Sequence, residues 1–304
     1  MINKTYIKLL SAAAFIAAFT FTMPSSQAAD GRALKLMESD RTIVVAHRGF
    51  SMGAPENTVP AFFWGKLAEA DMVELDFYVN KEGTLFCLHD RTLDRTTDIR
   101  STLSLTNATM LDLTDAQVRK LDAGKWKNPM YAGTPMPSLE EALIAIQADG
   151  GMTLAEHKTG SAAQCAAVLT KLDCVNDLIV QSFNWNFLAD MKKVLPEQIT
   201  VALGPQNEIR GVKLTAEQKV MDKTAVDEML KLGVAGAAWN KQLTPEGIEY
   251  AHSKGLKVFV YTINDIKEAQ GPSGPCDHRF AVLPVPDPSG GSSALYSAER
   301  RHCG

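Results

Sequence analysis

The sequence predicts an α/β protein of the TIM (β/α)8-barrel type. Short β-branched or apolar runs alternate with longer helical patterns along most of the chain, which favours a parallel sheet. Removal of residues 1–28 would leave 276 residues (304 − 28), a length that suits one barrel. No predicted strand is followed by the Gly-rich turn that binds dinucleotide cofactors, so a closed barrel is favoured over a doubly wound sheet.

The first 28 residues have the pattern of a secretory signal peptide. Lys4 and Lys8 lie near the amino end, Leu9–Thr22 is apolar, and the segment ends in small residues at Ala28. The apolar core is short for a membrane span, which needs about 20 residues. We therefore expect cleavage, no transmembrane anchor afterwards, and a periplasmic or secreted protein.

Composition limits the partners of the chain. It is 45% hydrophobic and 22% charged, so it can bury a full core. A net charge of −4 gives no electrostatic reason to expect nucleic acid or an anionic membrane as a partner.

Cys165 and Cys174 bracket a helical stretch that would hold them roughly 13 Å apart, so we predict no essential disulfide. The sequence leaves the oligomeric state open.

Periodicity gives the order of the elements. The predicted strands are Thr42–His47, Met72–Phe77, Thr84–His89, Met152–Glu156, Asp177–Ser182, Ile199–Leu203, Val234–Trp239 and Lys257–Ile263. The predicted helices are Val59–Ala70, Asp115–Leu121, Ser138–Ala148, Ala162–Leu172, Asn186–Val194, Lys223–Leu232, Thr244–Lys254 and Asp265–Gln270. Ser138 and Glu141 have capping-box spacing, and Pro245 follows Thr244 at a first helical position.

Two stretches interrupt the alternation. The connector between Asp76 and His89 is too short for a crossover helix, so it is either a tight turn or an extended return. Next, the polar and turn-rich residues 91–137 contain one convincing helix. We interpret them as an insertion after the third strand that shapes access to a site.

The carboxyl-terminal 34 residues depart from the barrel pattern. Residues 271–304 are rich in Pro, Gly and Ser, and their only apolar run, Arg279–Val285, is interrupted by Pro284. We interpret this tail as a shifted reading frame or a replaced terminus, with a natural lineage-specific tail as the alternative. The prediction is a barrel domain over residues 29–270 that lacks its regular last strand, followed by a disordered tail.

Charged residues gather where strands are predicted to end. The ends carry His47-Arg48, Glu74 with Asp76, His89-Asp90, and Glu156 with Lys158. In a parallel barrel these ends form the active face, and residues two apart on a strand share a face. Three converging carboxylates suit a hard cation such as Mg²⁺ or Ca²⁺. With two histidines and an arginine, this set favours metal-assisted cleavage of a phosphodiester.

Each of these residues has a structural alternative on its own. His47 could be a hydrogen-bonded core residue, Arg48 could be a surface ion-pair partner, and Glu74 with Asp76 could face solvent on an edge strand. Charged residues at four successive strand ends are improbable as surface charges without a function, and their joint occurrence favours an active site. His157 points away from Glu156, so we interpret it as structural.

These motifs resemble those of the glycerophosphodiester phosphodiesterases, over residues 42–270. The matching motifs are AHRG at Ala46–Gly49, PENT at Pro55–Thr58, ELD at Glu74–Asp76, LHD at Leu88–Asp90, RTTD at Arg95–Asp98, LDAG at Leu121–Gly124, PSLEE at Pro137–Glu141, AEHK at Ala155–Lys158, QSF at Gln181–Phe183 and YTIND at Tyr261–Asp265. The resemblance implies a TIM barrel with an insertion after its third strand, and hydrolysis of glycerophosphodiesters to glycerol 3-phosphate and an alcohol.

The resemblance also implies roles for single residues. It implies that His47 and His89 are the general acid and base. It implies that the metal is held by Glu74, Asp76 and Glu156, that Arg48 and Lys158 contact phosphate, that Glu56 and Asn57 shape the site, and that Trp239 and Tyr261 face the substrate. The family often has Trp at the position of Tyr261. A lysophospholipid or sphingomyelin-type phosphodiesterase, and an inactive exported phosphate-ester-binding protein, stay open as alternatives.

Overall fold

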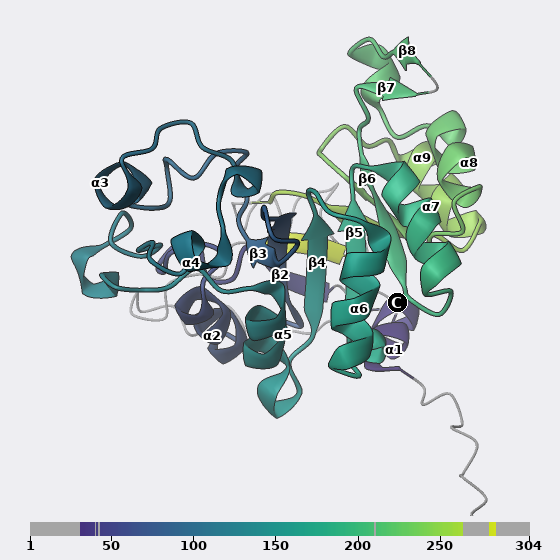
Figure 1. Ribbon diagram of the computed structural model, residues 1–304. Helices are drawn as coiled ribbons and strands as arrows, with labels where there is room; N and C mark the ends of the chain where they lie inside the picture. Colours follow the sequence, from purple (N-terminus) through teal and green to yellow (C-terminus); the bar gives the residue numbers. More distant parts are fainter. Residues whose placement is uncertain (1–30, 40, 42, 210, 264–279, 284–304) are drawn as a thin grey trace, which may run out of the picture.

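The computed structural model describes residues 31–39, 41, 43–209, 211–263 and 280–283, and shows a curled parallel sheet surrounded by helices (Figure 1). The parallel strands are β1 (Ile43–Ala46), β2 (Met72–Val79), β4 (Thr153–His157), β5 (Leu178–Ser182), β6 (Thr200–Gly204), β9 (Gly236–Trp239), β10 (Lys257–Val260) and β11 (Phe280–Leu283). Each strand pairs with the next in this order, and β1 pairs with both β2 and β11. The pairing order therefore returns to its first strand, as in a barrel.

The prediction that the last strand is missing is wrong. The backbone of β11 pairs in parallel with β1 from Ile43↔Phe280 to Ala46↔Leu283, and with β10 at Phe259↔Phe280. Strand pairing uses backbone groups, so a four-residue run can take this place although its sequence differs from the expected one. The rest of the predicted tail lies outside the described residues.

Helices cover the outside of the sheet, and their residue ranges lie close to the predicted ones. They are α2 (Val59–Leu67), α5 (Leu139–Gln147), α6 (Ala162–Lys171), α7 (Trp185–Val194), α8 (Lys223–Leu230) and α9 (Pro245–Ser253). The capping box of Ser138 and Glu141 is confirmed, as is Pro245 at the start of its helix. The predicted helix Asp265–Gln270 and the predicted signal peptide lie outside the described residues.

The two faces of the strands pack into different cores. Met72, Leu154, Ile179 and Phe259 face the barrel interior, whereas the alternate residues pack beneath the surrounding helices. Helix α1 (Arg32–Glu38), which was not predicted from periodicity, contributes three buried residues to the interior core. It covers one end of the barrel, beneath the sheet in Figure 1. The other end is left for polar side chains.

The third strand returns in the antiparallel direction. β3 (Leu85–Cys87) pairs with β2 from Phe77↔Cys87 to Val79↔Leu85, so the short connector is a tight turn. The residues after it contain α3 (Ile99–Leu103), the 3₁₀ turns η1 (Met110–Asp112) and η2 (Pro129–Tyr131), and α4 (Asp115–Val118). These residues, which we call the 91–137 segment, pack with Phe86 and Leu88 into a separate apolar cluster.

Two further features complete the described chain. A hairpin of β7 (Glu208–Ile209) and β8 (Val212–Lys213) projects beyond the helices (Figure 1). Short 3₁₀ turns η3 (Ala148–Gly150), η4 (Val175–Asp177) and η5 (Glu217–Lys219) lie in the connections. None of the helices in the described residues has the length and apolar character to cross a membrane.

Candidate active site

A tight turn after β1 places the first two charged residues. The Gly49 amide donates to the carbonyls of Ala46 and Glu74, at 3.2 Å each, which ties the turn to both neighbouring strands. Gly49 has φ +74°, and a Cβ there would lie 2.5 Å from the backbone of Ala61 in α2. Only glycine fits this combination of conformation and close approach. The turn carries His47 and Arg48 to the polar end of the barrel.

Three carboxylates meet inside this end of the barrel. Asp76 and Glu156 are register partners on β2 and β4, and Glu74 lies two residues before Asp76 on the same face. Their side chains are almost fully buried, and one oxygen from each lies within 4.8 Å of the others. The predicted convergence of these three residues is therefore seen in the structure.

Burial and mutual repulsion make this triad electrostatically costly. Burial, followed by the charges of Asp76 and Glu156, raises the pKa of Glu74 well above its usual value. Burial and Asp76 likewise raise the pKa of Glu156 to about 7. Burial also opposes ionisation of Asp76, but the charges of Lys158, His89 and Arg48 outweigh it and lower the pKa of this carboxyl.

The triad fits a hard divalent cation. Glu74 Oε2 accepts a hydrogen bond from the Arg48 amide at 2.7 Å, whereas Glu74 Oε1 is buried without a hydrogen-bond partner among the described residues. A buried, unpartnered carboxylate oxygen normally costs free energy. Carboxylate oxygens are the ligands that Ca²⁺ and Mg²⁺ prefer, and a cation here would satisfy Glu74 and offset the repulsion.

Two cationic side chains flank the carboxylates. Lys158 Nζ lies 2.9 Å from Asp76 Oδ1 and is hydrogen-bonded to Glu156. Arg48 Nη1 donates to Glu56 at 3.0 Å, and its Nε lies 3.7 Å from Asp76 Oδ2. Both side chains keep some exposure, 15% for Lys158 and 18% for Arg48. The two side chains therefore lie between the buried carboxylates and solvent, where they can contact an anionic substrate.

The loop before α2 supports the triad from the side. Asn57 donates to Asp76 Oδ2 at 2.8 Å and accepts from the Asp76 amide at 3.0 Å. This reciprocal pair fixes the orientation of one carboxylate. Glu56 accepts hydrogen bonds from Arg48 and from Arg95. Asn57 thus contacts the triad directly, and Glu56 contacts it through Arg48.

The two histidines reach the site from different strands. His47 follows β1, and burial together with the Arg48 charge lowers its pKa to about 4. His89 follows β3, its side chain is 33% exposed, and its Nδ1 lies 2.8 Å from Asp90 Oδ1. Because β3 runs antiparallel to β2, the chain beyond Cys87 returns to the level of Asp76, whose carbonyl accepts from the Leu88 amide. The antiparallel turn therefore brings His89 to the triad.

The structure separates the two aromatic residues that were predicted to face the substrate. Trp239 is 1% exposed, belongs to the core under the helices, and donates from Nε1 to the Lys219 carbonyl. It pairs with Val260, whereas its neighbour Ala238 pairs with Phe259 and faces the interior. The alternation of a strand thus turns Trp239 away from the site. Tyr261 packs against the interior core, and burial and the Glu156 charge raise its pKa.

Three residues near the site received no individual role from the sequence. Asp90 and Arg95 form ion pairs beside His89, and Phe183 is 39% exposed with its ring edge-on to Tyr261. Asp90 lies in the LHD motif at a charged strand end, and Arg95 and Phe183 lie in the RTTD and QSF motifs. The contacts of Arg95 with Glu56 and of Phe183 with Tyr261 join segments far apart in the chain, which periodicity does not reveal.

His157 is structural, as predicted. Its ring is buried, stacks on Phe187 with centroids 3.5 Å apart, and hydrogen-bonds to Ser182 and to the Gly160 carbonyl. We expect His157→Ala to lower the free energy of unfolding by about 2–4 kcal/mol, because it leaves a cavity and unpaired polar groups. Urea denaturation measures this loss. A change no larger than that of the exposed-site variant Lys120→Ala would contradict it.

The sequence profile of the glycerophosphoryl diester phosphodiesterase family matches residues 47–271. The chain belongs to this family. It is 31% identical over 261 residues to the glycerophosphodiester phosphodiesterase of Bacillus subtilis, covering 80% of this chain and 82% of that relative. To glycerophosphodiester phosphodiesterase 1 of Bos taurus it is 26% identical over 262 residues, covering 78% and 76%. The family and these relatives make the chain a phosphoric diester hydrolase.

Solved structures of the family share the fold. A phosphodiesterase from Oleispira antarctica aligns with a TM-score of 0.68 at 24% identity, over 82% of this chain and 96% of that chain. A glycerophosphodiester phosphodiesterase from Agrobacterium tumefaciens aligns with a TM-score of 0.62 at 25% identity, over 81% and 97%. These alignments confirm an α/β fold of the TIM-barrel type.

Proposed function

We propose that the protein hydrolyses glycerophosphodiesters to glycerol 3-phosphate and an alcohol, with Ca²⁺ or Mg²⁺ held by Glu74, Asp76 and Glu156. The buried triad with the unpartnered Glu74 Oε1 carries this proposal. The family membership supports it, as does the Oleispira antarctica structure, which was solved with the product sn-glycerol-3-phosphate. When bound, the cation would neutralise charge on the phosphate oxygens.

Arg48 and Lys158 are the proposed phosphate contacts. A phosphodiester is an anion, and both cationic side chains lie at the partly exposed rim of the triad. The planar guanidinium of Arg48 can donate to two phosphate oxygens, whereas Lys158 contributes a compact point charge. Together they would hold the phosphorus between the two histidines. Tyr261 remains the aromatic residue that we propose to face the substrate.

The different environments of His47 and His89 suggest that one acts as the general base and the other as the general acid. His47 has a pKa of about 4, so its ring is neutral near pH 7 and can accept the proton of the attacking hydroxyl. His89 hydrogen-bonds through Nδ1 to the Asp90 carboxylate, which leaves Nε2 directed to act on the substrate. His89 would then donate from Nε2 to the departing alkoxide. We propose His47 as the base and His89 as the acid.

The proposed compartment rests on residues 1–28. Their pattern supports export, so we propose that the mature enzyme begins after Ala28 and acts in the periplasm or outside the cell. Its substrates would be small glycerophosphodiesters that reach that compartment. Mass spectrometry of the amino terminus after expression with the native leader tests this; an uncleaved amino terminus would contradict it.

The test of the function is a metal-reconstitution assay. Purified protein, stripped with a chelator, should release no glycerol 3-phosphate from glycerophosphocholine, and addition of Ca²⁺ or Mg²⁺ should restore release. Activity that survives chelation would contradict the metal site. Lysophosphatidylcholine and sphingomyelin are tested in parallel, because preferential turnover of either would favour the alternative substrate classes. Binding of glycerophosphocholine without turnover would favour an inactive binding protein.

A further inference from the structure

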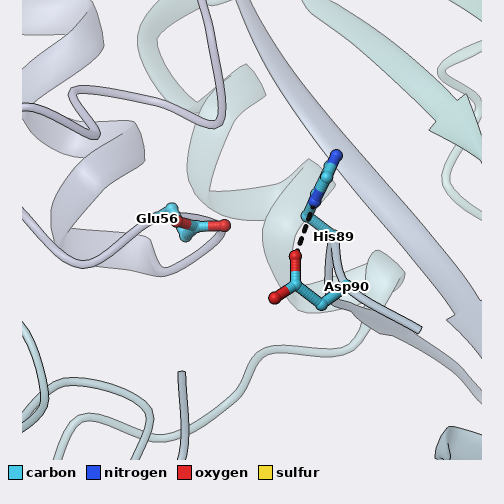
Figure 2. A group of neighbouring side chains, drawn as sticks. All are labelled: Glu56, His89 and Asp90. Carbon is cyan, nitrogen blue, oxygen red and sulfur yellow. Dashed lines mark hydrogen bonds and ion pairs between the residues drawn. The ribbon is translucent and has the colours of Figure 1, made fainter. Parts of the chain in front are cut away.

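A second group of possible metal ligands lies beside the triad. Glu56, His89 and Asp90 offer ligand atoms within 4.8 Å of one another, and Figure 2 shows the Glu56 carboxylate directed toward the His89–Asp90 pair. The place of a cation is already taken by Arg95. Its guanidinium donates to both oxygens of Asp90 and to both oxygens of Glu56, with the two Glu56 bonds at 2.7 and 2.8 Å. This group is therefore an arginine-centred network.

The Arg95 network joins three separate parts of the fold. Glu56 lies in the loop before α2, Asp90 follows β3, and Arg95 belongs to the 91–137 segment. Within that segment the Arg95 guanidinium lies 5.6 Å from the ring centre of Trp126, which gives it a second support. Since arginine presents several donors in a rigid plane, it can hold two carboxylates in one fixed geometry.

Each of the two carboxylates in the network also contacts a residue with a proposed role in the reaction. Glu56 Oε1 accepts from Arg95 and also from Arg48, the proposed phosphate contact. At the other end, Asp90 Oδ1 accepts from Arg95 and lies 2.8 Å from His89 Nδ1. An ionised carboxylate can only accept, so Nδ1 carries the proton and Nε2 is left to act on the substrate. The hydrogen bonds from Arg95 lower the pKa of Asp90, which keeps it an acceptor.

We propose that Arg95 is a positioning residue that holds Asp90 and Glu56, so that His89 presents Nε2 and Arg48 presents its guanidinium to one phosphodiester. The proposal rests on the proposed function of the site. Arg95 itself contacts neither the triad nor the reacting atoms in this arrangement; it acts through the two carboxylates. Arg95 thus links the 91–137 segment to His89 and Arg48 through Asp90 and Glu56.

The test compares Arg95→Met and Arg95→Lys with a control from the same segment. Arg100→Met removes a similar exposed ion pair, in which Arg100 donates to Asp94 at 2.9 Å. We expect Arg95→Met to lower kcat about 10- to 100-fold, as is typical for groups that orient a reacting residue, with KM changed less than about threefold. Lysine offers no planar fork, so Arg95→Lys should recover only part of the loss. Arg100→Met should match the wild type.

A spectroscopic measurement separates positioning from general damage. In histidine-labelled protein without substrate, ¹⁵N NMR at a pH where the ring is neutral should show His89 as the single Nδ1–H tautomer. The signal is assigned by its loss in His89→Asn. Arg95→Met should give a mixture of tautomers, whereas Arg100→Met should not. This result does not depend on turnover, so it stands or fails separately from the proposed function. An unchanged His89 tautomer in both Arg95 variants would overturn the proposal.

Discussion

Glu74→Gln is expected to abolish phosphodiester hydrolysis and to stabilise the metal-free protein. Removing a metal ligand should cost more than the roughly 10–100-fold loss seen for groups that only support a ligand. Without metal, the raised pKa of Glu74 means that its buried carboxyl must either carry a charge that repels Asp76 and Glu156 or take up a proton, and its Oε1 has no partner among the described residues. Glutamine avoids this cost of ionisation or protonation. The free energy of unfolding without metal should therefore rise by on the order of 1–3 kcal/mol.

Thermal unfolding with and without metal checks this prediction. A cation at 100 times its Kd should stabilise the wild type by about 2.7 kcal/mol, and Glu74→Gln should lose this gain. Glu208→Gln, an exposed change in the β7–β8 hairpin, is the matched control and should keep both activity and metal response. If Glu74→Gln retains the metal-dependent stabilisation, Glu74 is not a ligand.

His89→Asn is expected to lower kcat by about 10²- to 10⁴-fold, the usual contribution of a general acid or base. Its effect should depend on the leaving group, because the proposed role of His89 is to protonate the departing alkoxide. A substrate with a nitrophenolate leaving group needs no such proton and should recover much of the loss. His47→Asn, which removes the proposed base, should lose activity on both substrates.

The metal response separates this effect from damage to the site. His89→Asn should keep the thermal stabilisation by metal, because the triad is untouched. His252→Asn, in α9 outside the site, serves as the control for activity. An equal loss on both substrates in His89→Asn would contradict the role as acid, and recovery in His47→Asn instead would exchange the two assignments.

The sequence alone predicted the residues that meet at the barrel end. Inward-facing carboxylates at Glu74, Asp76 and Glu156 follow from the period of two along a strand, and strand ends converge in any parallel barrel. The helix starts at Ser138 and Thr244 were also predictable, because capping uses side chains within four residues of the amide they bind. Each of these features depends on local chemistry or on a periodic pattern.

The tertiary structure decided what periodicity could not. The direction of β3 depends on which strand its backbone pairs with, and the antiparallel choice brings His89 back to Asp76. Trp239 was misplaced because its side of the strand depends on register, and the register turns it under the helices. Likewise β11 lies in the ring because backbone pairing with β1 and β10 tolerates an unusual sequence.

The motifs therefore determined the chemistry that this chain can offer: two histidines, three carboxylates, and the cations Arg48 and Lys158. Folding determined which of these groups support one another. The bond from Arg95 to Asp90 spans only 5 residues of chain, whereas the bond from Arg95 to Glu56 spans 39 and forms only because the 91–137 segment folds back over the PENT loop. Contacts between distant segments depend on the packing of the whole barrel, and that packing carries no local signature in the sequence.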